Sequence, residues 1–544
     1  MLRNFTPRLT ALAAATLLAT GAHAFDIDAG DSDFKIRLDT TLRYSGGVRL
    51  KEQLPELSTL APVMTNQNDG NNNFKKGGLY SNRLDLLSEF DVVGPRYGLR
   101  VSAAAWYDAV YNGNTDNTTA TSNHRPANEF PSETRKIMGR DGEVLDAFVF
   151  GNFELGDRAA SVRFGRHTLL WGESLFFGAN GIAGGQAPTD LIKLLSVPNS
   201  QTKETALPTA KLSGSVQLSD SMTLGAYVGL EWKPSRLLPV GAYLNTSDTL
   251  GPEGGERILA GPTAQFVRSP ELEPSNSGQG GLQLRWRADS VDTDFGFYAI
   301  RFHAMTPSNI LTTLTGAPPA LVPSSYRWVY HEGIKAFGMS AAKTVDVWSL
   351  GAEVSYRQNA PLSSVGQTVL PTIGVNTTLD NKNNPGYAVG ETLHAQVSWL
   401  ASLGPFPLVQ ELSFLGEVAW NRLQKVTLNP NMLNPLANRN AASIRMVLSP
   451  TFRQVLPGLD LSVPMGASYT GGRSSALGPG FGTHKGGDFN IGLAGTYLSK
   501  YFFNLNYVNF YGPAGTSTDA ANRAQFKQAL ADRDYVSFSL RTTF

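Results

Sequence analysis

Residues 281–287 read GLQLRWR, a run in which apolar and polar side chains alternate strictly. Successive side chains of a β-strand point to opposite faces, so Leu282, Leu284 and Trp286 would share one face, opposite a polar face. Residues 79–92 repeat this pattern, with the charged residues on one parity. Charges at that density suit a water-filled lumen behind a lipid-facing band, not the dry core of a soluble sandwich. The pattern therefore predicts strands of an all-β, transmembrane antiparallel β-barrel.

Short and long breaks alternate along the whole chain, after a first strand predicted at residues 34–50. Eight tight turns can be placed, at Gly94-Pro95, Gly156-Asp157, Ser219-Asp220, Asp289-Ser290, Lys343-Thr344, Gly404-Pro405, Pro457-Gly458 and Ser499-Lys500. Nine longer polar segments separate them, near 51–78, 112–142, 172–206, 233–279, 306–324, 361–386, 424–440, 471–486 and 513–532. Short turns are expected in the periplasm and long loops outside the cell. This rhythm predicts about eighteen strands, or about sixteen if the segment 233–279 is miscounted.

Both ends of the chain suggest export to the outer membrane. Residues 1–24 have a basic head, an apolar stretch and the triplet Ala22-His23-Ala24, which predicts a signal peptide cleaved before Phe25. The apolar stretch is shorter than the roughly twenty residues of a spanning helix. Residues 25–544 are then expected to form a single barrel domain. The last strand ends on the aromatic Phe544, which we expect the barrel assembly machinery to recognise.

Composition excludes several other classes of protein. The chain has no cysteine, so neither a disulfide nor a lipid on an N-terminal cysteine is available. Without the two arginines of the signal peptide, 44 of the 46 basic residues remain against 45 acidic ones. This near-neutral charge argues against nucleic acid as a partner. Residues 66–73 contain one carboxylate, that of Asp69, which favours a polar turn in a surface loop over a calcium site. The sequence predicts no metal site and no cofactor.

Charged residues opposite apolar neighbours in predicted strands are the candidate lumen charges. Rings of such charges tune the selectivity of a pore. The alternative is that they pair across strands and fill the interior. The candidates are Arg37, Arg83, Asp85, Glu89, Arg163, Arg166, Arg285, Arg287, Glu353, Glu411 and Glu417.

The third long loop, residues 172–207, combines apolar residues with a glycine-rich run. Leu175, Phe176 and Phe177 would be exposed if the loop stood outside the membrane, so we expect part of it to fold inward and narrow the lumen. The alternative is a cap on the rim of the barrel. The candidate constriction residues are Trp171, Glu173, Leu175, Phe176, Phe177 and Asp190.

Two of the histidines, His303 and His394, fall in predicted strands, where a serine could in principle use either as a base. No local serine–histidine–acid signature accompanies them. The sequence therefore predicts no enzymatic activity.

Several sequence blocks resemble a proteobacterial outer-membrane family catalogued only as a domain of unknown function. The blocks are Asn68-Asp69-Gly70-Asn71 with Phe74, Ser81-Asn82-Arg83, Trp106-Tyr107-Asp108, Arg163-Phe164-Gly165-Arg166-His167, Trp171-Gly172-Glu173-Ser174, Pro188-Thr189-Asp190, Gly296-Phe297-Tyr298 and residues 351–356, GAEVSY. The WGES block at 171–174 is the most distinctive, although His167 stands where glutamine is expected. The resemblance covers essentially the whole chain after the signal peptide.

The resemblance implies a barrel encoded beside a second secreted family of unknown function and an inner-membrane pump of the resistance-nodulation-division (RND) type, often where lipids or steroids are handled. We therefore expect an outer-membrane channel or transporter component for apolar or amphipathic small molecules or lipids. It would contact outer-membrane lipid, a periplasmic partner protein and the pump. The alternatives are a general or substrate-selective hydrophilic porin, a lipid-processing enzyme of the outer membrane and an adhesin.

Overall fold

The computed structural model describes residues 25–27, 33–59, 66–120, 122–250, 257–261 and 263–544. The predicted signal peptide, residues 1–24, lies outside the described residues. No helix within the described ranges is long and apolar enough to cross a membrane.

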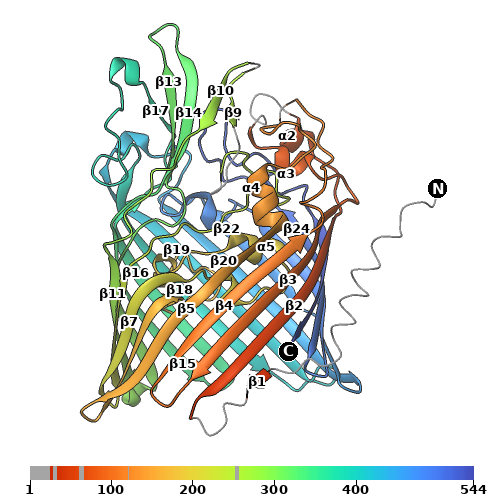
Figure 1. Cartoon of the computed structure of the whole chain (residues 1–544), viewed down its shortest axis with the longest axis vertical. Coiled ribbons are helices and arrows are strands. Elements are labelled where there is room, and N and C mark those ends of the chain that lie inside the picture. The colour runs from red at the N-terminus through yellow and green to blue at the C-terminus, as the bar shows by residue number, and fades with distance from the viewer. Residues whose placement is uncertain (1–24, 28–32, 60–65, 121, 251–256, 262) are drawn as a thin grey trace, which may run out of the picture.

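Eighteen antiparallel strands form one closed barrel (Figure 1). The ring closes where the first barrel strand pairs with the last, from Thr41 opposite Thr543 to Arg49 opposite Tyr535. The barrel strands are β2 (Lys35–Arg49), β3 (Leu79–Val93), β4 (Tyr97–Asp108), β5 (Arg140–Leu155), β6 (Arg158–His167), β7 (Thr209–Ser219), β8 (Met222–Gly229), β11 (Gln279–Ala288), β12 (Thr293–Phe302), β15 (Ile334–Val345), β16 (Trp348–Pro361), β18 (Val389–Leu403), β19 (Glu411–Leu428), β20 (Asn440–Leu456), the interrupted pair β21 (Leu459–Ser462) and β22 (Met465–Gly472), β23 (Gly487–Tyr497), β24 (Tyr501–Tyr511) and β25 (Tyr535–Thr543).

The two faces of the strands differ as the alternation predicts. On β3, Arg83 and Asp85 are buried at 2% and 6% exposure, whereas Leu84 and Leu86 are exposed at 41% and 40%. On β11, Leu282 and Trp286 are likewise exposed on the outer surface. A closed barrel leaves no unpaired strand edge, and an apolar outer surface suits hydrocarbon. The molecule is therefore a transmembrane β-barrel of the outer-membrane type.

Seven of the eight predicted turns lie within one residue of the observed ones, and one is wrong. Lys343 and Thr344 are part of β15, where they pair with Leu350 and Ser349. The hairpin instead turns at residues 346–347, where Asp346 has a φ of 52°. A two-residue hairpin needs this left-handed conformation, which aspartate adopts more readily than lysine or threonine.

The stretch before the first barrel strand holds one element that the sequence analysis missed. The short strand β1 (Phe25–Ile27) pairs antiparallel with β2, with Phe25 opposite Leu38. On the same strand, Thr40 exchanges two backbone hydrogen bonds with Phe544. Strand β1 therefore continues the pairing of β2 beyond the point where the last strand ends.

The nine long connections gather at one end of the barrel (Figure 1). They contain a five-stranded sheet that the sequence did not predict, built from β9 (Arg257–Leu259), β10 (Gln265–Arg268), β13 (Asn309–Thr315), β14 (Val322–Val329) and β17 (Gln367–Val369). Short helices complete the loops: α2 (Pro55–Ser58), α3 (Asp69–Asn72), α4 (Ser132–Thr134), η2 (Arg135–Gly139), η3 (Ile182–Gly185), α5 (Leu191–Ser196), α6 (Thr202–Thr205), η5 (Pro371–Ile373), η6 (Pro430–Met432) and η7 (Gly478–Phe481), with η4 (Asp289–Val291) in a short turn.

Residues 66–73 lie in the first long loop, as the sequence suggested, but neighbouring loops bury most of them. Asp69 is 3% exposed and accepts hydrogen bonds from the Asn123 backbone and from Asn117, both in the second loop. Asp248, in the fourth loop, accepts the backbone N–H groups of Asn68 and Asp69. Burial raises the pKa of Asp69 from 3.8 to about 6 and the pKa of Asp248 well above its ordinary value. This buried carboxylate pair joins three extracellular loops.

Candidate functional site

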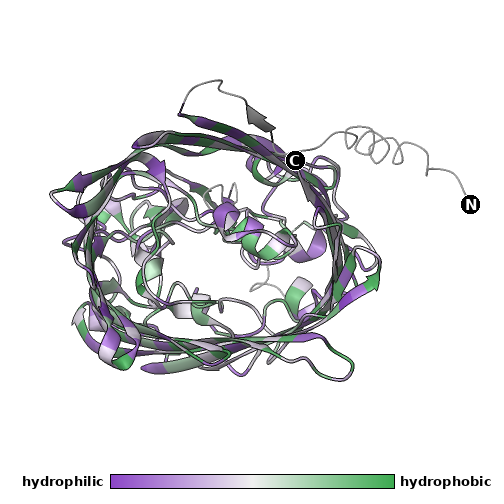
Figure 2. Ribbon diagram, turned by 90° about the horizontal axis from the view of Figure 1, so that it is seen from below, coloured by the Kyte–Doolittle hydropathy of each residue, from purple (hydrophilic) through white to green (hydrophobic). Residues whose placement is uncertain are grey.

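The loop between β6 and β7, residues 168–208, lies inside the barrel. Trp171 packs edge-on against Tyr227 of β8, with ring centroids 5.2 Å apart, and stacks at 6.3 Å on Tyr298 of β12. A Cβ added to Gly281 of β11 would come within 3.1 Å of the Trp171 ring, so glycine makes room for it. Seen along the barrel, segments of chain fill part of the ring (Figure 2).

Two wall glutamates hold the loop at the middle of the barrel. Glu353 of β16 accepts the backbone N–H groups of Glu173 at 2.9 Å and Ile182 at 2.7 Å. Glu417 of β19, which is fully buried, accepts the N–H groups of Leu175, Phe176 and Phe177 on a single oxygen.

This geometry explains the WGES block. Gly172 has a φ of 94°, and a Cβ there would collide with the Glu353 carboxylate. Ser174 turns its Oγ toward Glu417 at 3.4 Å.

An asparagine further along the loop makes a second anchor. Asn180 accepts a hydrogen bond from Asn421 and lies 3.0 Å from the ring of His394, while its amide donates to Gln396. Arg357 of β16 donates to the carbonyls of residues 179 and 181, at 2.9 and 2.8 Å. The first half of the loop is therefore bound to the wall formed by β15 to β19.

The second half of the loop returns across the lumen to the wall formed by β2 to β5. Asp190 accepts the N–H of Lys193 at the start of α5 and pairs with Arg236 at 2.7 Å. In α6, Glu204 pairs with Arg43 of β2 at 2.9 Å. Contacts with opposite walls show that the loop lies inside the lumen and does not cap the rim.

Most of the predicted lumen charges lie on the inner face, and most have partners there. Glu353 and Glu417 hold the loop as described. The others pair as follows: Arg37 with Asp39, Arg83 with Asp85, Glu89 with Arg100 and Lys203, Arg287 with Asp292 and Asp294, and Glu411 with Arg453. Arg163 lies over the Phe148 ring. Arg285 has no ion pair among the residues that the structure describes. Most of the predicted lumen charges are therefore neutralised by partners on the inner wall and do not form a ring of unpaired charges around the lumen.

The placement of Arg166 in the lumen is wrong. Residues three apart in a strand lie on opposite faces, so Arg163 and Arg166 cannot both point inward. Phe164, which shares the parity of Arg166, is 56% exposed on the outer surface. Arg166 lies near the end of β6 and pairs with Glu231 at 2.7 Å. This ion pair at the end of the strand allows a charged side chain to lie on the outer face.

Sequence reasoning missed Arg43, Asn180, Arg236 and Arg357. Arg357 shares the parity of Glu353 in the same strand, so alternation could have found it. The roles of Asn180 and Arg236 depend on contacts between distant segments, and no local signal marks them.

Apolar side chains lie on the inner wall on the periplasmic side of the Glu417 anchor. Leu400 of β18 pairs in register with Leu415 of β19, and Leu415 with Val447 of β20. All three point inward, and Leu400 is 45% exposed. Leu415 is one side-chain step below Glu417, about 7 Å along the strand. Because Leu175 is 41% exposed and lies at this anchor, loop and wall together present an apolar surface to the lumen.

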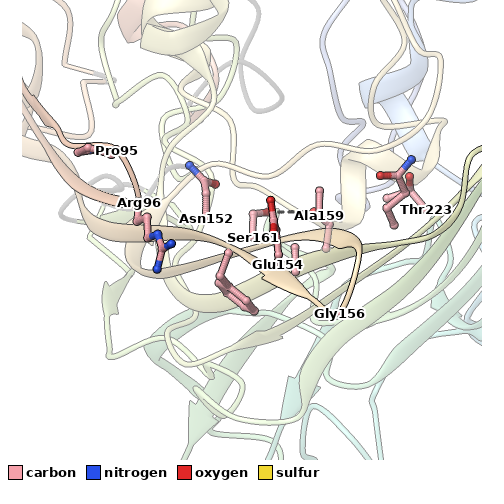
Figure 3. A pocket seen from close by; sticks show the side chains of 12 residues that line it. Pro95, Arg96, Asn152, Glu154, Gly156, Ala159, Ser161 and Thr223 are labelled. Carbon is pink, nitrogen blue, oxygen red and sulfur yellow. Dashed lines mark hydrogen bonds between the residues drawn. The ribbon is translucent and has the colours of Figure 1, made fainter.

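A polar cavity of about 890 Å³ opens at the periplasmic end of the inner wall. Figure 3 shows side chains of the β5–β6 hairpin, among them Asn152, Glu154 and Ser161, together with Thr223 of β8. The hydroxyls of Ser161 and Ser215 lie 2.9 Å apart. The lumen therefore has a polar vestibule on one wall and an apolar strip on another.

No group of three or more potential metal-binding side chains occurs in the described ranges. His303 and His394 contact backbone atoms or the side chains of Asn180 and Thr392. His167 does approach the Ser213 hydroxyl at 2.7 Å. Both residues are more than nine-tenths buried, and the other ring nitrogen of His167 faces the carbonyl of residue 165. Among the described residues no carboxylate contacts this pair, and its burial leaves no access for a substrate.

The closed barrel, its apolar outer surface and the loop held in its lumen define a β-barrel protein of the outer-membrane type. The sequence model of the family described as a protein of unknown function, DUF1302, matches residues 5–544, and the chain belongs to that family. No curated protein matches the sequence.

Among solved structures, the chain is similar to OccK1 (OpdK) of Pseudomonas aeruginosa, with 11% identity, a TM-score of 0.42 and coverage of 94% of this chain and 98% of that one. It is also similar to OccAB1 of Acinetobacter baumannii, with 9% identity, a TM-score of 0.44 and coverage of 96% and 98%.

Proposed function

We propose that this barrel is a channel that passes apolar or amphipathic small molecules, including lipids, across the outer membrane. The apolar strip formed by Leu400, Leu415 and Val447, together with the exposed Leu175 at the Glu417 anchor, carries this proposal. A polar solute gains nothing from such a surface, whereas an alkyl or ring body loses contact with water there. We further propose that cargo is exchanged with a periplasmic partner and an RND-type pump, as the family resemblance implies.

A hydrophilic porin is the second candidate. The polar cavity at the periplasmic mouth favours it, because Asn152, Ser161 and Thr223 can replace the water around a sugar or a small ion. The two functions predict opposite effects of a change in the apolar strip, which makes them separable.

The test replaces Leu400 and Leu415 with asparagine and measures flux into proteoliposomes. We expect octanoate flux to fall several-fold and glucose flux to stay the same or rise. The matched control is Ser413→Asn, a change at the next inward position toward the periplasm, which should leave octanoate flux as it is. Unchanged octanoate flux in the double variant would favour the hydrophilic porin.

Shortening the loop between residues 174 and 186 tests the barrier itself. We expect a larger single-channel conductance with normal barrel assembly, because this segment occupies part of the lumen. A shortened protein that conducts ions and passes octanoate like the parent would show that the loop does not limit passage.

A further inference from the structure

Two arginines lie side by side on the inner wall where the barrel closes. Arg43 of β2 and Arg541 of β25 are cross-strand partners, and like charges in that position repel each other. Glu204 bonds Arg43 at 2.9 Å, and Asp85 lies 3.7 Å from its Nε. Arg541 has no ion pair within the described part of the chain. Asp85 also pairs with Arg83 at 2.8 Å, so the one carboxylate bonded to this arginine pair at hydrogen-bond distance is that of Glu204, on Arg43. The charge of Arg541 is therefore left without a carboxylate partner within these described strands and loops.

Several donor atoms at this place have no acceptor among the described residues. They are Nε and Nη2 of Arg43 and Nε of Arg541, together with the hydroxyls of Ser45 and Ser539. Ser45 and Ser539 are themselves cross-strand partners and are 1% and 0% exposed. Buried polar groups are nearly always paired, so several orphaned donors on two neighbouring strands need an explanation.

The loop covers this cluster only loosely. Both arginines reach the carbonyl oxygen of Asn199, between α5 and α6, at 3.4 and 3.5 Å, which is the outer limit of a hydrogen bond. Glu204 balances the charge of Arg43, but a neutral carbonyl at 3.5 Å does not balance the charge of Arg541. Water could satisfy the hydroxyls but would leave the Arg541 charge uncompensated.

We propose that Arg43, Arg541, Ser45 and Ser539 form an oxyanion-binding subsite on the lumen wall, which takes the carboxylate or phosphate head of an amphipathic anion. Guanidinium groups match the planar geometry of these oxyanions, and serine hydroxyls add neutral donors. Arg541 is half-buried and lies 4.8 Å from the centroid of the Phe502 ring, so an apolar body can lie against that ring while the head is bound.

The choice of an amphipathic ligand rests on the proposed function, whereas the oxyanion site itself does not. Two of its residues belong to the first barrel strand and two to the last. The subsite therefore exists only in the closed barrel, which makes ligand binding a property of the fully assembled protein.

The test measures current block in planar bilayers by the full mature protein, with inorganic phosphate and octanoate as probes. We expect Arg541→Gln to raise the half-blocking concentration of both probes by about tenfold or more, since it removes one charged donor group. Ser539→Ala should give a smaller increase in the same direction. Because it removes a single hydroxyl, it serves as the second variant if Arg541→Gln assembles poorly, and heat-modifiable migration on gels checks the fold of both.

Arg163→Gln is the matched control, since Arg163 is also an inward-facing arginine but lies on β6, away from the closing strands. It should leave both half-blocking concentrations unchanged. If Arg541→Gln weakens block by phosphate but not by octanoate, the oxyanion site is supported, and the proposal that the cargo is amphipathic is refuted. If neither probe is sensitive to Arg541 or Ser539, the subsite itself is refuted.

Discussion

Replacing Glu417 with glutamine tests whether the wall glutamates hold the loop in the lumen. One oxygen of this carboxylate accepts three consecutive backbone N–H groups, those of residues 175–177. Glutamine has nearly the same shape and keeps one acceptor oxygen but loses the charge. The side chain is fully buried, so water does not screen the change.

The size of the effect follows from the three bonds. Hydrogen bonds to a charged acceptor contribute about 1.5–3 kcal/mol each, against about 1 kcal/mol for neutral ones. Neutralising an acceptor shared by three donors should then weaken the docked loop by roughly 2–4 kcal/mol in total. That corresponds to a roughly 30-fold to 700-fold larger population of the released loop. We expect frequent openings to a higher conductance level.

Single-channel recording in planar bilayers is the assay, with labelling of a cysteine at position 177 as a second readout of loop release. The control is Glu411→Gln, because Glu411 pairs with the exposed Arg453 at the periplasmic mouth and does not touch the loop. If Glu417→Gln shows the conductance pattern and labelling rate of the parent, the carboxylate does not hold the loop and the reasoning fails.

Three further predictions follow from other parts of the structure. Fractionation should place mature protein beginning at Phe25 in the outer membrane, and recovery mainly as a folded periplasmic protein would contradict this. Arg285→Cys should react with a small polar thiol reagent, because its side chain faces the lumen, while Leu284→Cys should be shielded by lipid. The opposite labelling pattern would show that the inward and outward faces of β11 have been assigned the wrong way round. Because burial raises the pKa of Asp69 from 3.8 to about 6, the extracellular loops should be most stable below about pH 4 and lose stability as the pH rises to about 6. Limited proteolysis of these loops should therefore be slower near pH 5 than near pH 7.5. The variant Asp248→Asn should reduce this difference in rate. Equal rates at the two pH values in the parent would refute the link between Asp69 protonation and loop stability.

The barrel could be predicted because its signals are local. Alternation assigns each face of a strand from neighbouring residues, and turns at sites such as Gly156-Asp157 depend on two or three residues. Arg166 was misplaced only because alternation was not applied across the whole of β6. The inward loop could also be predicted in outline, since Leu175 and its apolar neighbours have no stable place outside the membrane.

The rest of the site depends on contacts that no local pattern encodes. Asn180 gains its role from side chains more than two hundred positions away. The five-stranded sheet forms from short segments of three different loops, and two of its pairings are parallel. Asp69 is buried because a distant loop covers it, whereas its own neighbours in sequence are all polar.

The inward loop also bears on how the barrel assembles. One of its hydrogen bonds joins Phe177 to Glu417, which lies 240 positions later in the chain. The loop therefore cannot bind the wall until the later strands have formed. Long-range contacts of this kind slow folding, and apolar segments exposed in the meantime favour aggregation. The second half of the loop contacts Arg43 and Arg541, which face each other only after the first and last strands meet. Loop docking and seam closure should therefore occur in one cooperative step, late in biogenesis.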